Sequence, residues 1–112
     1  MSAAEPGAPL ISVAARDALR WALAPGVGPI LFGRIVERFG SAGAALSASP
    51  RELAGIRGIS HESADAICAA VRAAPIEREI EAAAEIGARI LCREDDAYPR
   101  GLLRIPDPPI VL

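Results

Sequence analysis

The sequence contains no lysine and few aromatic residues. All 12 of its basic side chains are arginine, and aromatic residues make up 4% of the 112 residues. Hydrophobic residues as a whole make up 52%, so the core must be built mainly from Leu, Ile, Val and Ala. Alanine loses no side-chain entropy in a helix. The composition therefore predicts a small, mainly α-helical protein.

Long hydrophobic runs are also missing. No apolar run approaches the roughly 20 residues that span a bilayer, so we expect no membrane contact. The first nine residues have no basic region and do not form a secretory signal, and we interpret residues 1–11 as a disordered tail. Cys68 and Cys92 are the only cysteines. Without a signal peptide, they predict reduced thiols and a cytoplasmic location.

Signals for catalysis or for a bound cofactor are absent as well. His61 is the single histidine and has no cysteine beside it, so it forms no metal-ligand pattern. The acidic run at residues 94–96 lacks the ligand spacing of a calcium loop and is interpreted as a surface loop. No phosphate-binding or dinucleotide-binding glycine motif occurs. We expect no enzyme activity, no cofactor and no metal.

The charge is unevenly distributed along the chain. The net charge is −2, which argues against strong binding of nucleic acid by the whole surface. Between Ser12 and Gly58, however, six arginines stand against three acids, whereas between Ile59 and Tyr98 nine acids stand against four arginines. Any nucleic-acid contact should therefore lie on the first half of the chain.

Helix signals follow one another over residues 12–87. Serines that can cap a helix N-terminus stand at positions 12, 41, 49 and 60, and prolines suited to a first turn stand at 29 and 75. Ser49 and Glu52 form a capping-box pattern. The predicted helices cover about 12–24, 29–39, 41–46, 49–54, 60–73 and 75–87.

The pattern changes after Gly87. Residues 88–92 read as a short strand, a proline-containing segment follows, and residues 110–112 read as the opening of another strand. A strand that opens at the end of a chain has no evident partner sheet. We therefore expect residues 88–112 to be a strand and a linker at the start of a truncated domain.

Two stretches of the helical region repeat without gaps at an offset of 32 residues. Gly26, Val27 and Gly28 align with Gly58, Ile59 and Ser60. Further along, the repeat pairs Phe32 with Ala64 and Ile35 with Ile67. A glycine, an aliphatic residue and a small residue, followed by apolar residues at helical spacing, resemble the helix–hairpin–helix motif.

Such a hairpin suits a phosphate group. It exposes backbone N–H groups at a helix N-terminus, where the helix dipole also favours an anion. Contacts of this kind read the nucleic-acid backbone and are independent of base sequence. The predicted DNA-binding residues are those of the two hairpins and two nearby arginines: Gly26, Val27, Gly28, Arg34, Arg57, Gly58, Ile59 and Ser60.

Two features depart from the motif and leave an alternative open. Ser60 replaces the second glycine of the second hairpin, and Phe32 stands where alanine is usual. Both departures weaken the prediction of a phosphate clamp. In the alternative interpretation, the hairpins only connect packed helices.

The last part of the chain resembles a known family. Its residues follow the pattern D-x-Y-P-x-x-L-x-x-I-x-D-P-P-x-x-L, from Asp96 through Tyr98 and Pro99 to Leu112. This pattern is similar to the segment that joins the N-terminal domain to the Rossmann-like domain in the DNA processing protein A (DprA, or Smf) family. The resemblance implies a mainly α fold, a SAM-like or tandem helix–hairpin–helix bundle over residues 12–87, with a short strand and the linker into a missing Rossmann-like domain over 88–112.

The resemblance also implies a function. Members of this family bind incoming single-stranded DNA during natural transformation and help to load the RecA recombinase. The main DNA site and the homodimer surface of the family belong to the Rossmann-like domain, so they cannot be carried over to residues of this chain. The chain is then an accessory N-terminal domain. The alternative is a protein-interaction or scaffolding module with no DNA affinity of its own.

Overall fold

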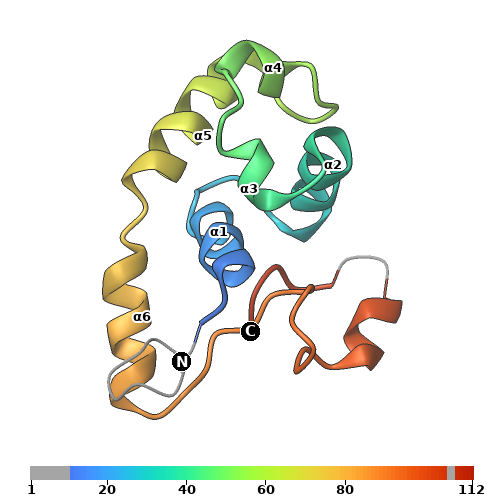
Figure 1. Ribbon diagram of the computed structural model, residues 1–112. Helices are drawn as coiled ribbons and strands as arrows, with labels where there is room; N and C mark the ends of the chain where they lie inside the picture. Colours follow the sequence, from blue (N-terminus) through green and yellow to red (C-terminus); the bar gives the residue numbers. More distant parts are fainter. Residues whose placement is uncertain (1–10, 106–107) are drawn as a thin grey trace.

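The computed structural model describes residues 11–105 and 108–112. The predicted disordered tail, except for Ile11, and two linker residues, Pro106 and Asp107, lie outside this part of the chain. The described residues form a mainly helical fold, as predicted, with six α-helices and one 3-10 helix (Figure 1). The helices are α1 (Val13–Ala22), α2 (Pro29–Phe39), α3 (Ala42–Ala45), α4 (Pro50–Ala54), α5 (His61–Ala73), α6 (Ile76–Glu85) and η1 (Arg100–Arg104).

The helix starts lie where the capping residues predict them. The hydroxyls of Ser12, Ser41 and Ser60 each accept a hydrogen bond from the backbone N–H three residues later. At the start of α4, Ser49 and Glu52 form the predicted capping box. These side chains satisfy backbone donors that the helices themselves leave without partners.

Helix α1 lies at the centre of the bundle. It packs against α3, α5 and α6, while α2 packs against α3, and α4 against α5 (Figure 1). Trp21 of α1 is the largest fully buried side chain, and its indole N–H donates to the carbonyl of Ala42 over 3.0 Å. Many of the surrounding core residues are alanines. Small side chains let the helix backbones approach closely, so a single tryptophan suffices to fill the centre.

The segment after α6 folds back onto the helices. We call residues 91–105 and 108–112 the arm. Leu91 and Leu112 exchange two backbone hydrogen bonds of 3.1 and 2.9 Å, and Cys92 and Val111 form an isolated antiparallel bridge. The pairing extends no further within the described residues, so the strand predicted at 88–92 is not confirmed. Cys92 and Ile110 are buried and belong to the same core cluster as the helices.

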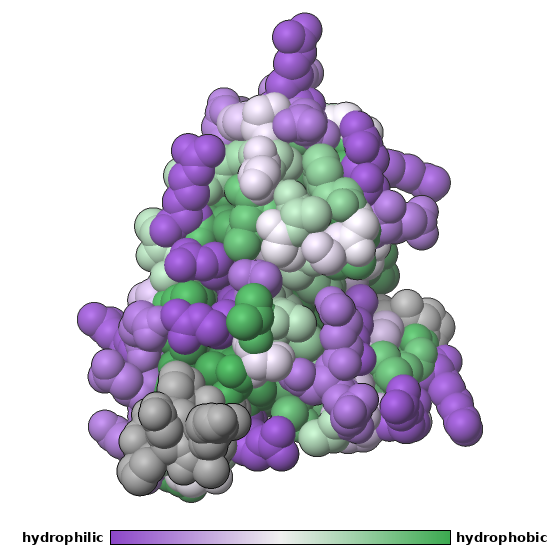
Figure 2. All heavy atoms as spheres, viewed as in Figure 1, coloured by the Kyte–Doolittle hydropathy of each residue, from purple (hydrophilic) through white to green (hydrophobic). Residues whose placement is uncertain are grey.

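The surface is mixed in polarity. Figure 2 shows hydrophilic side chains projecting around the outline of the molecule, with apolar and near-neutral residues across the middle of this face. Among the residues described, no helix combines the length and hydrophobicity needed to cross a bilayer.

The capping box gives a first prediction. Replacing Ser49 by alanine removes the acceptor for the N–H of Glu52, and we expect the free energy of unfolding to fall by about 1 kcal/mol. The matched control is Ser47→Ala, at an exposed serine between α3 and α4. Urea unfolding followed by Trp21 fluorescence measures both variants. Equal stability losses in the two variants would contradict this role for Ser49.

Candidate nucleic-acid interface

The two predicted hairpins have the same backbone geometry. We call residues 24–28 the first hairpin, between α1 and α2, and residues 56–60 the second hairpin, between α4 and α5. Gly26 and Gly58 have φ angles of 90° and 100°, in the left-handed region that favours glycine. In each hairpin, the N–H of the aliphatic residue donates to the carbonyl three positions earlier, over 3.2 Å for Val27 and 3.0 Å for Ile59. The structure thus reproduces the sequence repeat.

The aliphatic residues point inward. Val27 is 7% exposed and Ile59 is 6% exposed, and both belong to the core cluster. Their side chains therefore belong to the core, and their role in DNA binding stays a prediction. Gly26, Gly58 and Ser60 are exposed. The aliphatic side chains are thus turned into the core, while the other exposed hairpin residues, Arg57 among them, face solvent.

The two hairpins differ at the position that caps the following helix. Gly28 and Ser60 have similar extended conformations, with φ and ψ of −95° and −178° for Gly28 and −82° and 168° for Ser60. The Ser60 hydroxyl accepts from the N–H of Ser63 over 3.0 Å, whereas no side chain caps α2. Glu62 places a carboxylate in the first turn of α5, while the first turn of α2 has no acid. The first hairpin is therefore the better anion site.

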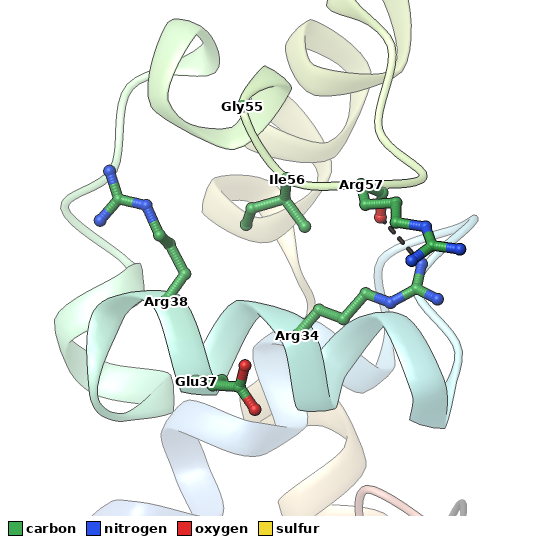
Figure 3. A pocket seen from close by; sticks show the side chains of 6 residues that line it. All are labelled: Arg34, Glu37, Arg38, Gly55, Ile56 and Arg57. Atoms are coloured by element: carbon green, nitrogen blue, oxygen red, sulfur yellow. Dashed lines mark hydrogen bonds between the residues drawn. The ribbon is translucent and has the colours of Figure 1, made fainter.

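Arg34 connects α2 with the second hairpin. From α2, its Nη1 donates to the carbonyl of Arg57 over 2.9 Å (Figure 3). A Cβ atom added to Gly58 would lie 3.1 Å from the same Nη1. The glycine thus provides both the positive φ angle and the space for the guanidinium. The sequence repeat did not reveal this contact, because it joins non-equivalent positions of the two units.

Open hollows lie on both sides of Arg34. One of about 330 Å³ runs between the first turn of α2 and Gly58. Another, of about 490 Å³, is lined by Arg38 and Arg57 and continues along α2. In Figure 3 the side chains of Arg34 and Arg57 lie together, while Arg38 stands at the other end of the hollow. All three arginines are exposed, so this face can receive an anionic chain.

Glu37 sets a limit on the positive charge of this face. It lies between Arg34 and Arg38 in the sequence and also lines the larger hollow. In Figure 3 its carboxylate points to the side of α2 away from Arg57. The positive charge is therefore concentrated where Arg34 and Arg57 meet.

Sequence reasoning missed the role of Arg93. This arm residue lies with its guanidinium carbon 5.2 Å from the centre of the Phe32 ring, and its Nη2 donates to the carbonyl of Pro29 over 3.3 Å. Phe32 thus has a partner that explains why a large residue replaces the usual alanine. In the sequence, only the phenylalanine at a position where alanine is usual pointed to this contact. It does not indicate which distant residue covers the ring.

The remaining reactive groups form no second site. His61 is exposed, and the described residues hold no group of three or more His, Cys, Asp or Glu side chains that could bind a metal ion. Burial raises the pKa values of the Cys68 and Cys92 thiols, so both stay protonated at neutral pH. Burial also opposes ionisation of Asp95, but the N–H of Cys92, 2.8 Å from its Oδ2, helps to bring the pKa of Asp95 below its ordinary value. The hydrogen bond between Cys92 and Asp95 lies within the arm.

Comparison with known proteins agrees with this geometry. The sequence model of the family described as DprA-like N-terminal HHH domain matches residues 13–82, well over half of the chain. The chain belongs to this family. Searches of curated proteins and of solved structures gave no match. The DprA-like match begins with α1, includes both hairpins and ends within α6, so it does not include Tyr98 or the proline pattern of the arm.

The second hairpin of this DprA-like domain gives a stability prediction. Gly58→Ala should lower the free energy of unfolding by about 1–2 kcal/mol from backbone strain, with a further loss from the clash with Arg34. Gly26→Ala is the matched control, because Gly26 has a similar φ angle and no atom within 4 Å of an added Cβ. Urea unfolding compares the two. A Gly58 variant no less stable than the Gly26 variant would show that the Arg34 guanidinium moves aside without cost, against this prediction.

Proposed function

We propose that this chain is the accessory N-terminal domain of a single-stranded-DNA-binding, RecA-loading protein of natural transformation. In this proposal the domain adds a weak, sequence-independent contact with the nucleic-acid backbone. The main DNA site and the homodimer surface would belong to a further, Rossmann-like domain. The domain itself would have no catalytic role and would act in the cytoplasm.

The observation that carries the proposal is the hydrogen bond that joins α2 to the second hairpin. Arg34 binds the carbonyl of Arg57 and lies between two hollows. The first turn of α2 and Gly58 line one of them, and Arg57 and Arg38 line the other. A single hairpin could only join two helices. A hollow lined by both hairpins, with arginines beside it, offers a nucleic-acid backbone more than one contact.

The first hairpin should provide the main phosphate contact. Pro29 has no N–H, so the donors available at the start of α2 are those of Ile30 and Leu31. At the second hairpin the Ser60 hydroxyl already occupies the N–H of Ser63, and Glu62 repels an anion. Phosphate should therefore bind at the first hairpin, with Arg57 supplying charge from the second.

Affinity should be modest. The exposed arginines of this face are few, and the protein carries a net charge of −2. Backbone contacts of this kind weaken steeply as salt rises, because bound counterions are released on binding. A contact of this strength suits an accessory domain whose effect adds to that of a main site.

Arg57 provides the direct test. Arg57→Gln should weaken binding of a labelled single-stranded oligonucleotide and reduce the slope of log K against log salt by about one. Fluorescence anisotropy at low salt is the measurement. Arg78→Gln, at an exposed arginine of α6 on another part of the molecule, is the control and should bind as the unmodified protein does.

The same titration separates the proposal from its alternative. If the unmodified domain shows no anisotropy change up to high micromolar concentration, the domain does not bind DNA by itself. The scaffolding interpretation then holds. If it binds and Arg57→Gln and Arg78→Gln lose affinity equally, the contact is diffuse and the hairpin face is not the site.

Gly28 offers a second, opposite test. Gly28→Ser should raise the free energy of unfolding by a few tenths of a kcal/mol, because Gly28 has nearly the conformation of Ser60 and space for a side chain. The new hydroxyl should occupy an N–H of α2 and weaken DNA binding. Urea unfolding and anisotropy together measure the two effects. A more stable variant with unchanged affinity would rule out the α2 N-terminus as the phosphate site.

A further inference from the structure

The arm carries contacts that a passive linker does not need. It lies beyond the matched part of the family, yet the hydroxyl of Tyr98, a residue 1% exposed, donates to the carbonyl of Pro109 over 2.8 Å. Leu91 and Leu112 close the two ends of the arm through their paired backbone groups. The arm is therefore a loop whose two ends are joined by hydrogen bonds.

Arg93 fastens this loop to α2. On the arm side, its Nε donates to the carbonyl of Pro109 over 3.4 Å, and its Nη2 donates to the carbonyl of Pro108. On the helix side, the same Nη2 donates to the carbonyl of Pro29, and the guanidinium stacks on Phe32. One half-buried side chain thus contacts both ends of the arm and the first turn of α2.

The chemistry of these contacts is specific to arginine. The one ion pair among the described residues joins Arg16 and Glu77, so Arg93 is held by carbonyl groups and an aromatic face rather than by a carboxylate. A planar guanidinium can donate in several directions and stack at the same time. A lysine ammonium cannot reproduce that combination.

We propose that Arg93 is a positioning residue that latches the arm to the first turn of α2, so that the arm and the first hairpin move as one body. Pro29 is the first residue of α2 and directly follows Gly28 of the first hairpin. A change in the orientation of the arm would therefore be transmitted to the hairpin backbone. The inference concerns the free protein and does not depend on the proposed DNA contact.

Hydrogen exchange of backbone amides tests the latch. In Arg93→Ala, the amides of Leu91, Tyr98 and Leu112 should exchange about tenfold faster or more, the factor expected from losing one charge-assisted hydrogen bond. The central amides of α5 should keep their rates. Arg89→Ala, at an exposed arginine beside the arm, is the matched control and should leave all of these rates unchanged.

Two outcomes would overturn the proposal. Arm amides that exchange in Arg93→Ala as in the unmodified protein would show that other contacts hold the arm. If Arg93→Ala instead speeds exchange in α5 as much as in the arm, Arg93→Lys decides. This variant keeps the charge and the aliphatic stem but lacks the planar guanidinium. Faster amide exchange in the arm alone supports the latch. Unchanged exchange, or exchange that is equally faster in the arm and in α5, refutes it.

Discussion

The small side chains of the core constrain the rest of the structure. Alanines from α1, α3 and α5 share the core with Trp21, and several of the helices are short. Short helices leave a large share of their backbone donors at exposed ends. Serine caps satisfy those ends at four of the six α-helices. The fold is therefore one in which side-chain caps satisfy backbone groups at most helix starts.

Much of this architecture follows from local sequence signals. Capping serines and helix-starting prolines act over three or four residues, so the helix starts could be predicted. The repeat at an offset of 32 residues predicted two similar hairpins, and the similar positive φ angles of Gly26 and Gly58 agree with it. The strand predicted at 88–92 is not confirmed. Strand pairing depends on a partner distant in the sequence, and here Leu91 and Leu112 exchange only two backbone hydrogen bonds.

The family assignment has a different basis in the sequence and in the comparison. The sequence interpretation relied on the tyrosine and proline pattern of the arm, whereas the family match covers residues 13–82 and thus the hairpins. The arm pattern still has a physical reason. Tyr98 and Arg93 both bind the carbonyl of Pro109, a residue that cannot donate a backbone hydrogen bond of its own. Spacing in the sequence could reveal that such a segment exists, but not that it contacts α2.

The two hairpins differ in what occupies the N–H groups at the start of the helix that follows. Ser60 caps α5 with its own hydroxyl, which stabilises the helix and removes a donor that a phosphate could use. Gly28 gives α2 no such cap, so the donors there stay available, but the first turn needs support from elsewhere. Arg93 contacts this end of α2, at the carbonyl of Pro29 and the ring of Phe32. The departures from the motif at Ser60 and Phe32 therefore coincide with two different arrangements: Ser60 caps its own helix, and Phe32 lies under the guanidinium of Arg93 from the arm.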